Sequence, residues 1–154
     1  MRKAIKYTQI TIFIDLIIAL CVFIWISWEF GPIQSLKVVI SDLWFNLVFA
    51  IFCLVLCSYY FGRLMNKLIC NKRWNSIVVG IIGMLLVLLT GTIGGSTVGF
   101  IEEGIISNNS LCDSIFDYYY KPLYWIFLFG SIPTIISGAI LGFVIKLKTC
   151  YNNV

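Results

Sequence analysis

The sequence contains no histidine and few charged residues, and these two scarcities narrow its possible functions. Histidine is absent from all 154 residues, so the chain has no imidazole to act as a general base or metal ligand. Charged residues make up 12% of the chain, against about 25% in a soluble domain, and 60% of the residues are hydrophobic. This composition excludes a soluble enzyme domain, a disordered tail and a nucleic-acid-binding module. It indicates an integral membrane protein.

Motifs that carry catalysis are also missing. The sequence has no phosphate-binding loop, nucleotide-binding glycine fingerprint, CxxC pair or GxSxG elbow. The adjacent carboxylates of Glu102 and Glu103 would point to different sides of a helix or strand, so they do not form an acid–base pair. We therefore expect a non-enzymatic protein with no cofactor, no metal and no direct nucleic-acid binding.

Four hydrophobic runs are long enough to cross a bilayer, which takes roughly 20 apolar residues in a helix. They cover residues 8–28, 43–61, 76–96 and 122–145. The first run is too long for the hydrophobic region of a signal peptide, so we expect it to remain as a helix. The pattern predicts an all-α membrane protein: one domain over residues 1–154, built as a bundle of four transmembrane helices.

The charges are distributed unequally between the two ends of the predicted bundle. One side carries six of the seven acidic residues, with only Lys37 and Lys121 as basic ones. The other side carries no acidic residue and nine of the eleven basic ones: Arg2, Lys3, Lys6, Arg63, Lys67, Lys72, Arg73, Lys146 and Lys148. The positive-inside rule then places both termini in the cytoplasm. We expect the membrane to be the bacterial inner membrane.

Little of the chain is expected to lie outside the bilayer. Residues 62–75 form the predicted cytoplasmic loop, and residues 100–121 form the largest predicted outer loop. Residues 31–42 carry apolar side chains at helical spacing, which predicts a short segment lying on the membrane surface. None of these pieces is large enough to build a hydrophobic core of its own.

Six cysteines are present, and their predicted positions do not indicate a site. Cys21 lies in the first run, Cys70 and Cys150 face the cytoplasm, and Cys112 alone reaches an oxidising compartment, without an outer partner in the chain. Cys53 and Cys57 share a helix face and could bind a soft metal, but no further ligand pair accompanies them. Small polarisable residues at a helix–helix contact are the favoured interpretation.

Small residues recur along the third and fourth runs, where they would allow close helix packing. Counted from the cytoplasmic ends, Gly83 lies level with Gly138, and Gly91 lies level with Gly130. This match predicts a tight hairpin of the two helices, with spare glycine surface facing another subunit of a homo-oligomer. Pro133 is expected to kink the fourth helix. The predicted packing residues are Gly83, Gly91, Gly95, Gly99, Gly130, Thr134, Gly138 and Gly142.

Asp15 is the one ionisable residue placed well inside a predicted span. A carboxylate within a membrane is costly and marks a functional hypothesis by default. Depth matching offers Ser58 and Ser137 as its hydrogen-bond partners. Asp15 would either serve as a proton or cation site, or lie at an oligomer axis, or remain a neutral acid bonded to a neighbouring hydroxyl.

Three classes of function fit this layout. The first is a membrane anchor or sensor subunit whose effector is a separate cytoplasmic protein, docked at the basic loop residues Arg63, Lys67, Lys72 and Arg73. The second is an immunity protein that blocks a pore-forming toxin, and the third is a small channel or transporter that uses Asp15. The first is favoured, because the chain has no soluble effector domain and its cytoplasmic face is uniformly basic.

In size and layout the chain resembles the membrane subunit of the Kiwa anti-phage defence system. The resemblance covers the four spans, the basic loop between Arg63 and Arg73 and the absence of a soluble domain. It implies a membrane sensor of phage infection that is coupled to a nucleic-acid-directed cytoplasmic partner. It assigns no role to an individual residue.

Overall fold

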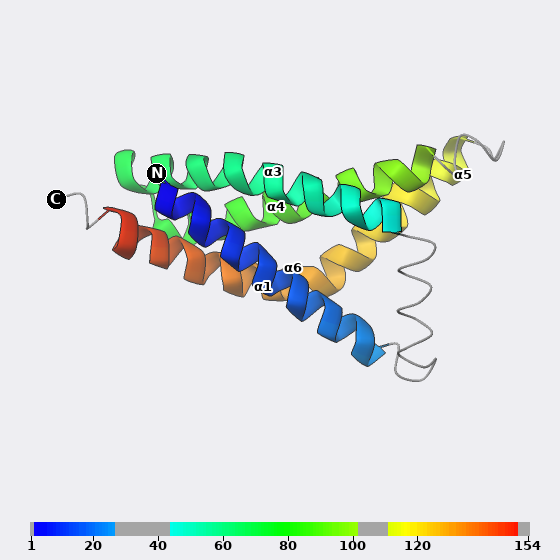
Figure 1. Cartoon of the computed structure of the whole chain (residues 1–154), viewed down its shortest axis with the longest axis horizontal. Helices are drawn as coiled ribbons and strands as arrows, with labels where there is room; N and C mark the ends of the chain where they lie inside the picture. The colour runs from blue at the N-terminus through cyan, green and yellow to red at the C-terminus, as the bar shows by residue number, and fades with distance from the viewer. Residues whose placement is uncertain (1, 27–43, 102–110, 151–154) are drawn as a thin grey trace.

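A computed structural model describes residues 2–26, 44–101 and 111–150, and these residues are helical except in the turn 72–75 (Figure 1). Four helices are long and apolar enough to span a membrane: α1 (Arg2–Ile26), α3 (Trp44–Asn66), α4 (Ser76–Gly99) and α6 (Lys121–Ile145). No strand occurs in these three ranges. The chain is therefore a multi-pass membrane protein with an all-α fold. The surface segment predicted at residues 31–42 lies outside the described residues.

Most large hydrophobic side chains point outward, as a lipid environment requires. Phe13 and Ile132 are each 65% exposed, and every spanning helix carries several such residues. The buried apolar core is small and lies mainly toward the end of the bundle where the termini meet: Ala4, Ile12, Met65, Ile69, Val79, Met84, Val87, Leu141 and Ile145. Lipid contact, rather than a large interior, accounts for the composition of the chain.

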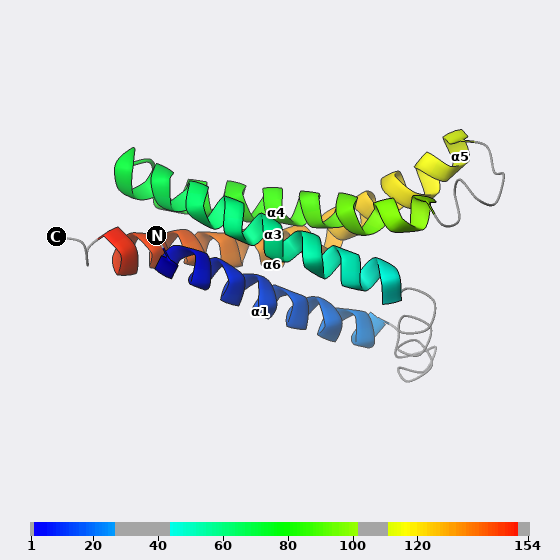
Figure 2. The same ribbon diagram turned by 45° about the horizontal axis from the view of Figure 1, so that its top comes forward.

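The helix α4 packs against both α3 and α6, and these are the two most extensive helix–helix contacts in the described part of the chain. The helix α1 lies across α3 and α6, and in Figure 1 it diverges from α3 toward its C-terminal end. In Figure 2, α1 runs along the edge of the bundle away from α4. Within the described part of α1, only Ala4, Thr8 and Ile12 are buried. The close approach to α3 occurs at Gly62, where an added Cβ atom would lie 2.9 Å from Thr8 Oγ1.

At the end of the bundle that carries both chain termini, α1 and α3 extend beyond the apolar runs from which they were predicted. The helix α1 begins at Arg2 instead of residue 8, and α3 continues to Asn66 and into the π-helical turn η2 (Lys67–Asn71). The predicted loop 62–75 is thereby reduced to residues 72–75. The chain between Arg63 and Asn71 contains neither proline nor glycine, and its arginine, leucine, methionine and lysine residues favour helix.

Of the loop predicted over residues 100–121, residues 100–101 continue the preceding helix and residues 102–110 lie outside the described residues. The prediction is also wrong from residue 111 onward. There α5 (Leu111–Ile115) and the π-helical turn η4 (Phe116–Tyr120) run directly into α6. The predicted fourth apolar run begins at Pro122, a residue that lacks a backbone N–H donor. The wide turn before it, in which the N–H of Lys121 bonds to the carbonyl of Phe116, accommodates this proline within a continuing helix.

Candidate functional site

The two termini and the turn between α3 and α4 lie at the same end of the bundle (Figure 1). We call this the basic end. It consists of the first two turns of α1, the last turn of α3, η2, residues 72–75 and the π-helical turn η5 (Lys146–Cys150) that follows α6. Eight exposed basic side chains gather there: Lys3, Lys6, Arg63, Lys67, Lys72, Arg73, Lys146 and Lys148.

Acidic side chains are far from the basic end in the part of the chain that the structure describes. Asp113 and Asp117 precede α6 at its opposite end, and Asp15 lies within the α1 span. The described ion pair joins Lys121 to Asp117, also at that far end. The basic end therefore presents a surface of one charge sign.

Backbone geometry at the end of η2 fixes the direction of two of these side chains. The N–H of Lys72 bonds to the carbonyl of Lys67 at 3.3 Å, and the N–H of Trp74 bonds to the carbonyl of Leu68 at 3.2 Å. Arg73 lies between them in the left-handed conformation, with φ of 54°. This conformation is typical of the residue just after a helix, although glycine usually occupies it. The turn holds Lys72 and Arg73 next to each other outside the helices.

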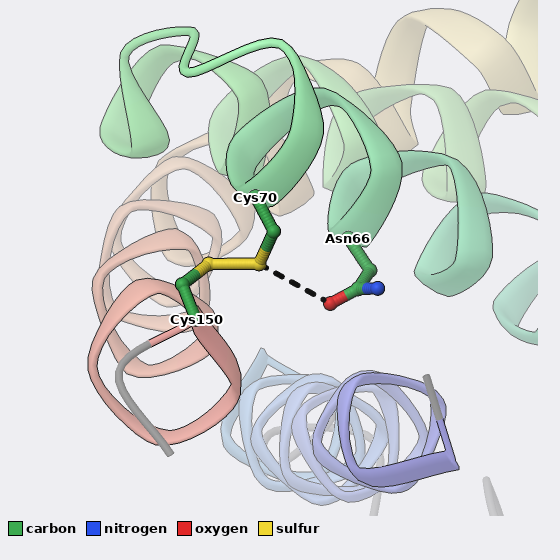
Figure 3. Close-up of a disulfide and its surroundings, with 3 residues drawn as sticks. All are labelled: Asn66, Cys70 and Cys150. Atoms are coloured by element: carbon green, nitrogen blue, oxygen red, sulfur yellow. Dashed lines mark hydrogen bonds between the residues drawn. A yellow bond between two sulfur atoms is a disulfide. The ribbon is translucent and has the colours of Figure 1, made fainter. Parts of the chain in front are cut away.

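A disulfide between Cys70 of η2 and Cys150 of η5 joins two parts of the basic end (Figure 3). The two residues are 80 positions apart in the sequence, and their Cα atoms are 5.3 Å apart. The sequence predicts these two cysteines on the same side of the membrane but indicates no bond between them. Oδ1 of the buried Asn66 lies 3.6 Å from Cys70 Sγ (Figure 3).

The other four cysteines are free, with Cys21 and Cys112 exposed and Cys53 and Cys57 half-buried. Cys53 lies against α4, where an added Cβ atom on Gly94 would be 2.7 Å from its Sγ. Among the described residues, no cluster of three or more histidine, cysteine or carboxylate groups could hold a metal ion. The position of Cys53 agrees with a helix–helix contact.

Asp15 forms a hydrogen bond between α1 and α6. Its Oδ2 accepts from Ser137 Oγ at 2.8 Å, while its Oδ1 is buried without a hydrogen-bond partner in the described part of the chain. Ser58, the other predicted partner, donates to the carbonyl of its own helix at Val55, at 2.6 Å. Of the two proposed partners, the structure brings Ser137 to Asp15.

The Ser137 hydroxyl has a single hydrogen but lies near two acceptors. Besides Asp15 Oδ2, the carbonyl of Thr134 is 3.2 Å away. The hydroxyl hydrogen can serve either acceptor, and a neutral Asp15 would instead donate to Ser137 Oγ and leave that hydrogen for Thr134. The contacts of Asp15 therefore suffice for a structural link between helices.

The predicted hairpin of α4 and α6 is present, with its register shifted by three residues. Gly138 lies against Gly80, not Gly83, and an added Cβ atom on Gly138 would be 2.9 Å from the carbonyl oxygen of Gly80. Gly142 lies against the backbone of Ser76 in the same way. At these positions backbone meets backbone, so no side chain fits.

The remaining small residues lie against other parts of the same chain. Gly83 faces Met65, Gly91 faces Leu54 and Gly95 faces Ala50, all on α3; Gly99 faces Tyr118 and Asn46, Gly130 faces Leu88, and Thr134 is buried. The predicted depth match of Gly91 with Gly130 is wrong, since Gly91 turns toward α3. Gly83, Gly91, Gly99, Gly138 and Gly142 are therefore buried within the chain, whereas Gly95 and Gly130 are half-buried.

Two buried amides were missed by the sequence analysis. Asn66 lies beside the disulfide, and Asn46 has a buried Oδ1 with no hydrogen-bond partner among the described residues. Asn46 Nδ2 would lie 3.2 Å from a Cβ atom on Gly99. A polar amide within an apolar run was the available signal at Asn46, whereas Asn66 lies beyond the predicted run, next to Lys67, and gave no such signal.

Comparison with known proteins gives no relative: the chain matches no family model, no curated protein and no solved structure.

Proposed function

We propose that the chain is a non-enzymatic membrane anchor and sensor subunit whose basic end binds a separate cytoplasmic effector. The observation that carries this proposal is the gathering of eight exposed basic side chains from four chain segments at one end. These side chains come from the start of α1, the end of α3 with η2, the following turn, and η5.

A charged surface of this kind attracts and orients a partner of opposite charge. The clustered positive charges of the basic end would raise the association rate of an acidic protein. Several weak contacts on one surface would then act together to hold that protein after it has docked. Anionic lipid would also be attracted, at about 1 kcal/mol per basic residue near the membrane. Binding of a protein partner can be distinguished from binding of lipid, because only the former should depend on particular side chains of the turn and of η2.

The proposal extends to the setting in which the subunit works. In a homo-oligomer of the bacterial inner membrane, each copy would add its basic end to a shared cytoplasmic platform. Because the glycines at the close contact of α4 and α6 are buried within the chain, self-association would use lipid-facing surfaces. The layout of four spans with a basic connection between α3 and α4 supports a role like that of the Kiwa membrane subunit, in which a membrane event during phage infection is relayed to the effector.

The decisive experiment changes Lys67, Lys72 and Arg73 together to glutamine. The variant should insert normally, because the other basic residues retain the charge bias, but recovery of a stoichiometric cytoplasmic protein in mild detergent should fall about tenfold or more. The matched control keeps the charge as Lys67→Arg, Lys72→Arg and Arg73→Lys, and it should retain the partner. Raising the salt concentration should release the partner from the wild type.

Other outcomes separate the competing functions. If the glutamine variant retains both its partner and its protection against phage, the basic end is only a topology signal and the proposal fails. Recovery of a pore-forming toxin would instead indicate an immunity protein. Ion flux in liposomes that Asp15→Leu abolishes would indicate a channel or transporter.

A further inference from the structure

The Cys70–Cys150 disulfide lies at the end of the molecule that the charge pattern assigns to the cytoplasm. Its Cα–Cα distance of 5.3 Å falls within the range usual for disulfides. The cytoplasm keeps thiols reduced, and disulfides found there are mostly transient, catalytic or redox-sensing. A cysteine pair that is close enough to bond, yet faces a reducing compartment, is expected to alternate between bonded and free.

The surroundings of the pair suit both states. In the bonded state Cys70 Sγ carries no hydrogen, so the 3.6 Å contact with Asn66 Oδ1 is not a hydrogen bond (Figure 3). After reduction the Cys70 thiol becomes a donor, and the same amide oxygen is in place to accept from it. Asn66 is buried, so water has little access to the amide oxygen and the thiol is its natural partner. The amide thereby stabilises the reduced form without rearrangement.

The bonded state also has a local cost next to Cys150. The hydroxyl of Thr149 is buried and has no hydrogen-bond partner in the part of the chain that the structure describes. A buried unpaired hydroxyl is unfavourable. Reduction would release η5 from η2 and allow this hydroxyl to reach water, so breaking the disulfide is expected to loosen the C-terminal turn.

We propose that Cys70 and Cys150 form a reversible thiol–disulfide site that controls how the basic end presents its lysines. Lys67 and Lys72 lie on either side of Cys70, and Lys146 and Lys148 precede Cys150 in η5. The disulfide holds these four exposed side chains in one arrangement. After reduction, the two lysines of η5 are no longer fixed relative to the other two. The proposal rests on the proposed function, because it concerns regulation of the same docking surface.

The exchange requires a cytoplasmic dithiol as reductant. Its thiolate attacks Cys150 Sγ, the S–S bond breaks, and Cys70 leaves as a thiolate that takes up a proton and donates it in a hydrogen bond to Asn66. The second thiol of the reductant then breaks the mixed disulfide. The result is two protein thiols and one oxidised reductant, with two electrons transferred. A disulfide oxidant reverses the same steps.

The state of the pair is measured by trapping the chain with a maleimide polymer after denaturation. The chain has six cysteines, of which four are free, so the bonded form takes four labels and the reduced form takes six. In cells, we expect dithiothreitol and diamide to shift the chain between these forms. A chain that stays at four labels after dithiothreitol, or at six after diamide, overturns the proposal.

A change at Asn66 tests the assigned stabilisation of the thiol. In mixtures of oxidised and reduced dithiothreitol, Asn66→Leu should favour the disulfide about threefold to tenfold, because the thiol loses its acceptor. Cys112→Ser, which removes a free cysteine elsewhere, should leave the midpoint unchanged. A wild-type midpoint in Asn66→Leu overturns the role of the amide.

The effect on the basic end is measured with poly-glutamate as an acidic probe. The bonded form should bind it about threefold more tightly than the reduced form, since its lysines are pre-organised. Chemically reduced wild type and the double variant Cys70→Ser/Cys150→Ser should bind poly-glutamate with the same affinity. This agreement would show that the weaker binding of the variant does not come from misfolding. Equal binding by bonded and reduced protein overturns the proposed control.

This test is separable from that of the proposed function. Labelling and probe binding use the purified chain or whole cells and need no partner. A pair that never changes state overturns the thiol proposal and leaves the partner assay intact. A glutamine variant that keeps its partner overturns the proposed function and leaves the thiol measurements intact.

Discussion

Asp15 and Ser137 are 122 residues apart, and their hydrogen bond joins the loosely packed α1 to α6. Hydrogen bonds between membrane helices contribute only about 0.6 kcal/mol on average, because polar groups find other partners in the unfolded chain. The bond therefore contributes more to how α1 is oriented than to overall stability. An acid that is needed only for this bond should be replaceable by its amide.

Asp15→Asn should keep the melting temperature and biological activity of the wild type. The asparagine amide donates to Ser137 Oγ, and Ser137 continues to donate to Thr134, so no group loses its partner. Asp15→Leu removes the bond between helices and should cost about 0.6 kcal/mol in detergent unfolding followed by circular dichroism. Loss of activity in Asp15→Asn, at normal expression and stability, would contradict a structural role and favour a proton or ion site.

Arg73 adopts a backbone conformation that costs an ordinary L-residue about 1–2 kcal/mol. Glycine adopts it without a steric penalty but is more flexible in the unfolded chain. Arg73→Gly should therefore stabilise the protein by about 0.5–1 kcal/mol in the same unfolding measurement. Lys72→Gly is the control, since Lys72 has a negative φ, and it should be neutral or destabilising. If Arg73→Gly is destabilising, the arginine side chain makes a contribution that outweighs the backbone cost.

At the scale of helices, two kinds of glycine contact hold α4 in place. Toward α6, the glycines allow backbone to touch backbone; toward α3, they receive side chains such as those of Met65 and Leu54. A flexible side chain yields to an added methyl group, whereas a neighbouring backbone does not. The two faces of α4 should therefore differ in their tolerance of substitution.

Gly138→Ala should lower stability by about 2 kcal/mol, because its Cβ would lie 2.9 Å from the oxygen of Gly80 and from Cα of Ile81. Gly130 is a matched control on the same helix, since its Cβ would lie 3.6 Å from Ile126 and 3.7 Å from Leu88, ordinary contact distances. Gly130→Ala should be neutral or slightly stabilising. Equal melting temperatures for the two variants would show that the close approach of α4 and α6 does not contribute to the stability of the fold.

The four spans could be predicted, because length and apolar composition determine which segments enter lipid, and their small residues predicted the pairing of α4 with α6. Their ends could not, since apolar runs stop near the membrane surface while helices such as α3 continue to Asn66 and into η2. The register of α4 on α6 was missed because depth counting assumes equal starting points. Gly91 could not be assigned to α3 because small residues do not indicate which neighbour they face.

At the scale of the whole molecule, burial is concentrated at the basic end. Ala4, Met65 and Ile145 are almost completely buried there, and the disulfide joins two turns of the same end, whereas α1 diverges from α3 toward the other end (Figure 1). The surface proposed for docking is thus built on the best-packed part of the fold. A rigid base favours a binding surface, because less freedom is lost on association.

Only part of the candidate site, the basic end with its disulfide, could be predicted from the sequence. Arg63, Lys67, Lys72 and Arg73 were identified because topology rules act on charge along the chain. An even number of spans brings both termini to the same end of the bundle as these residues, which places there the four lysines near the termini: Lys3, Lys6, Lys146 and Lys148. The Cys70–Cys150 bond could not be predicted, since pairing across 80 residues depends on how η2 meets η5. Asn66 acquires its significance only through that bond.

The orientation of the molecule decides how its basic end and its disulfide are to be understood together, and reporter fusions measure it directly. Alkaline phosphatase folds only outside the cytoplasm, so a fusion after Val154 should be inactive and one near Asn109 should be active. This result follows from nine basic residues at the terminal end, of which Arg63, Lys67, Lys72 and Arg73 lie in one connection between helices. A fluorescent protein that requires the cytoplasm serves as the control and should give the opposite pattern. Activity after Val154 would reverse the bundle, make the Cys70–Cys150 bond a permanent extracellular link and remove the basis for a cytoplasmic partner.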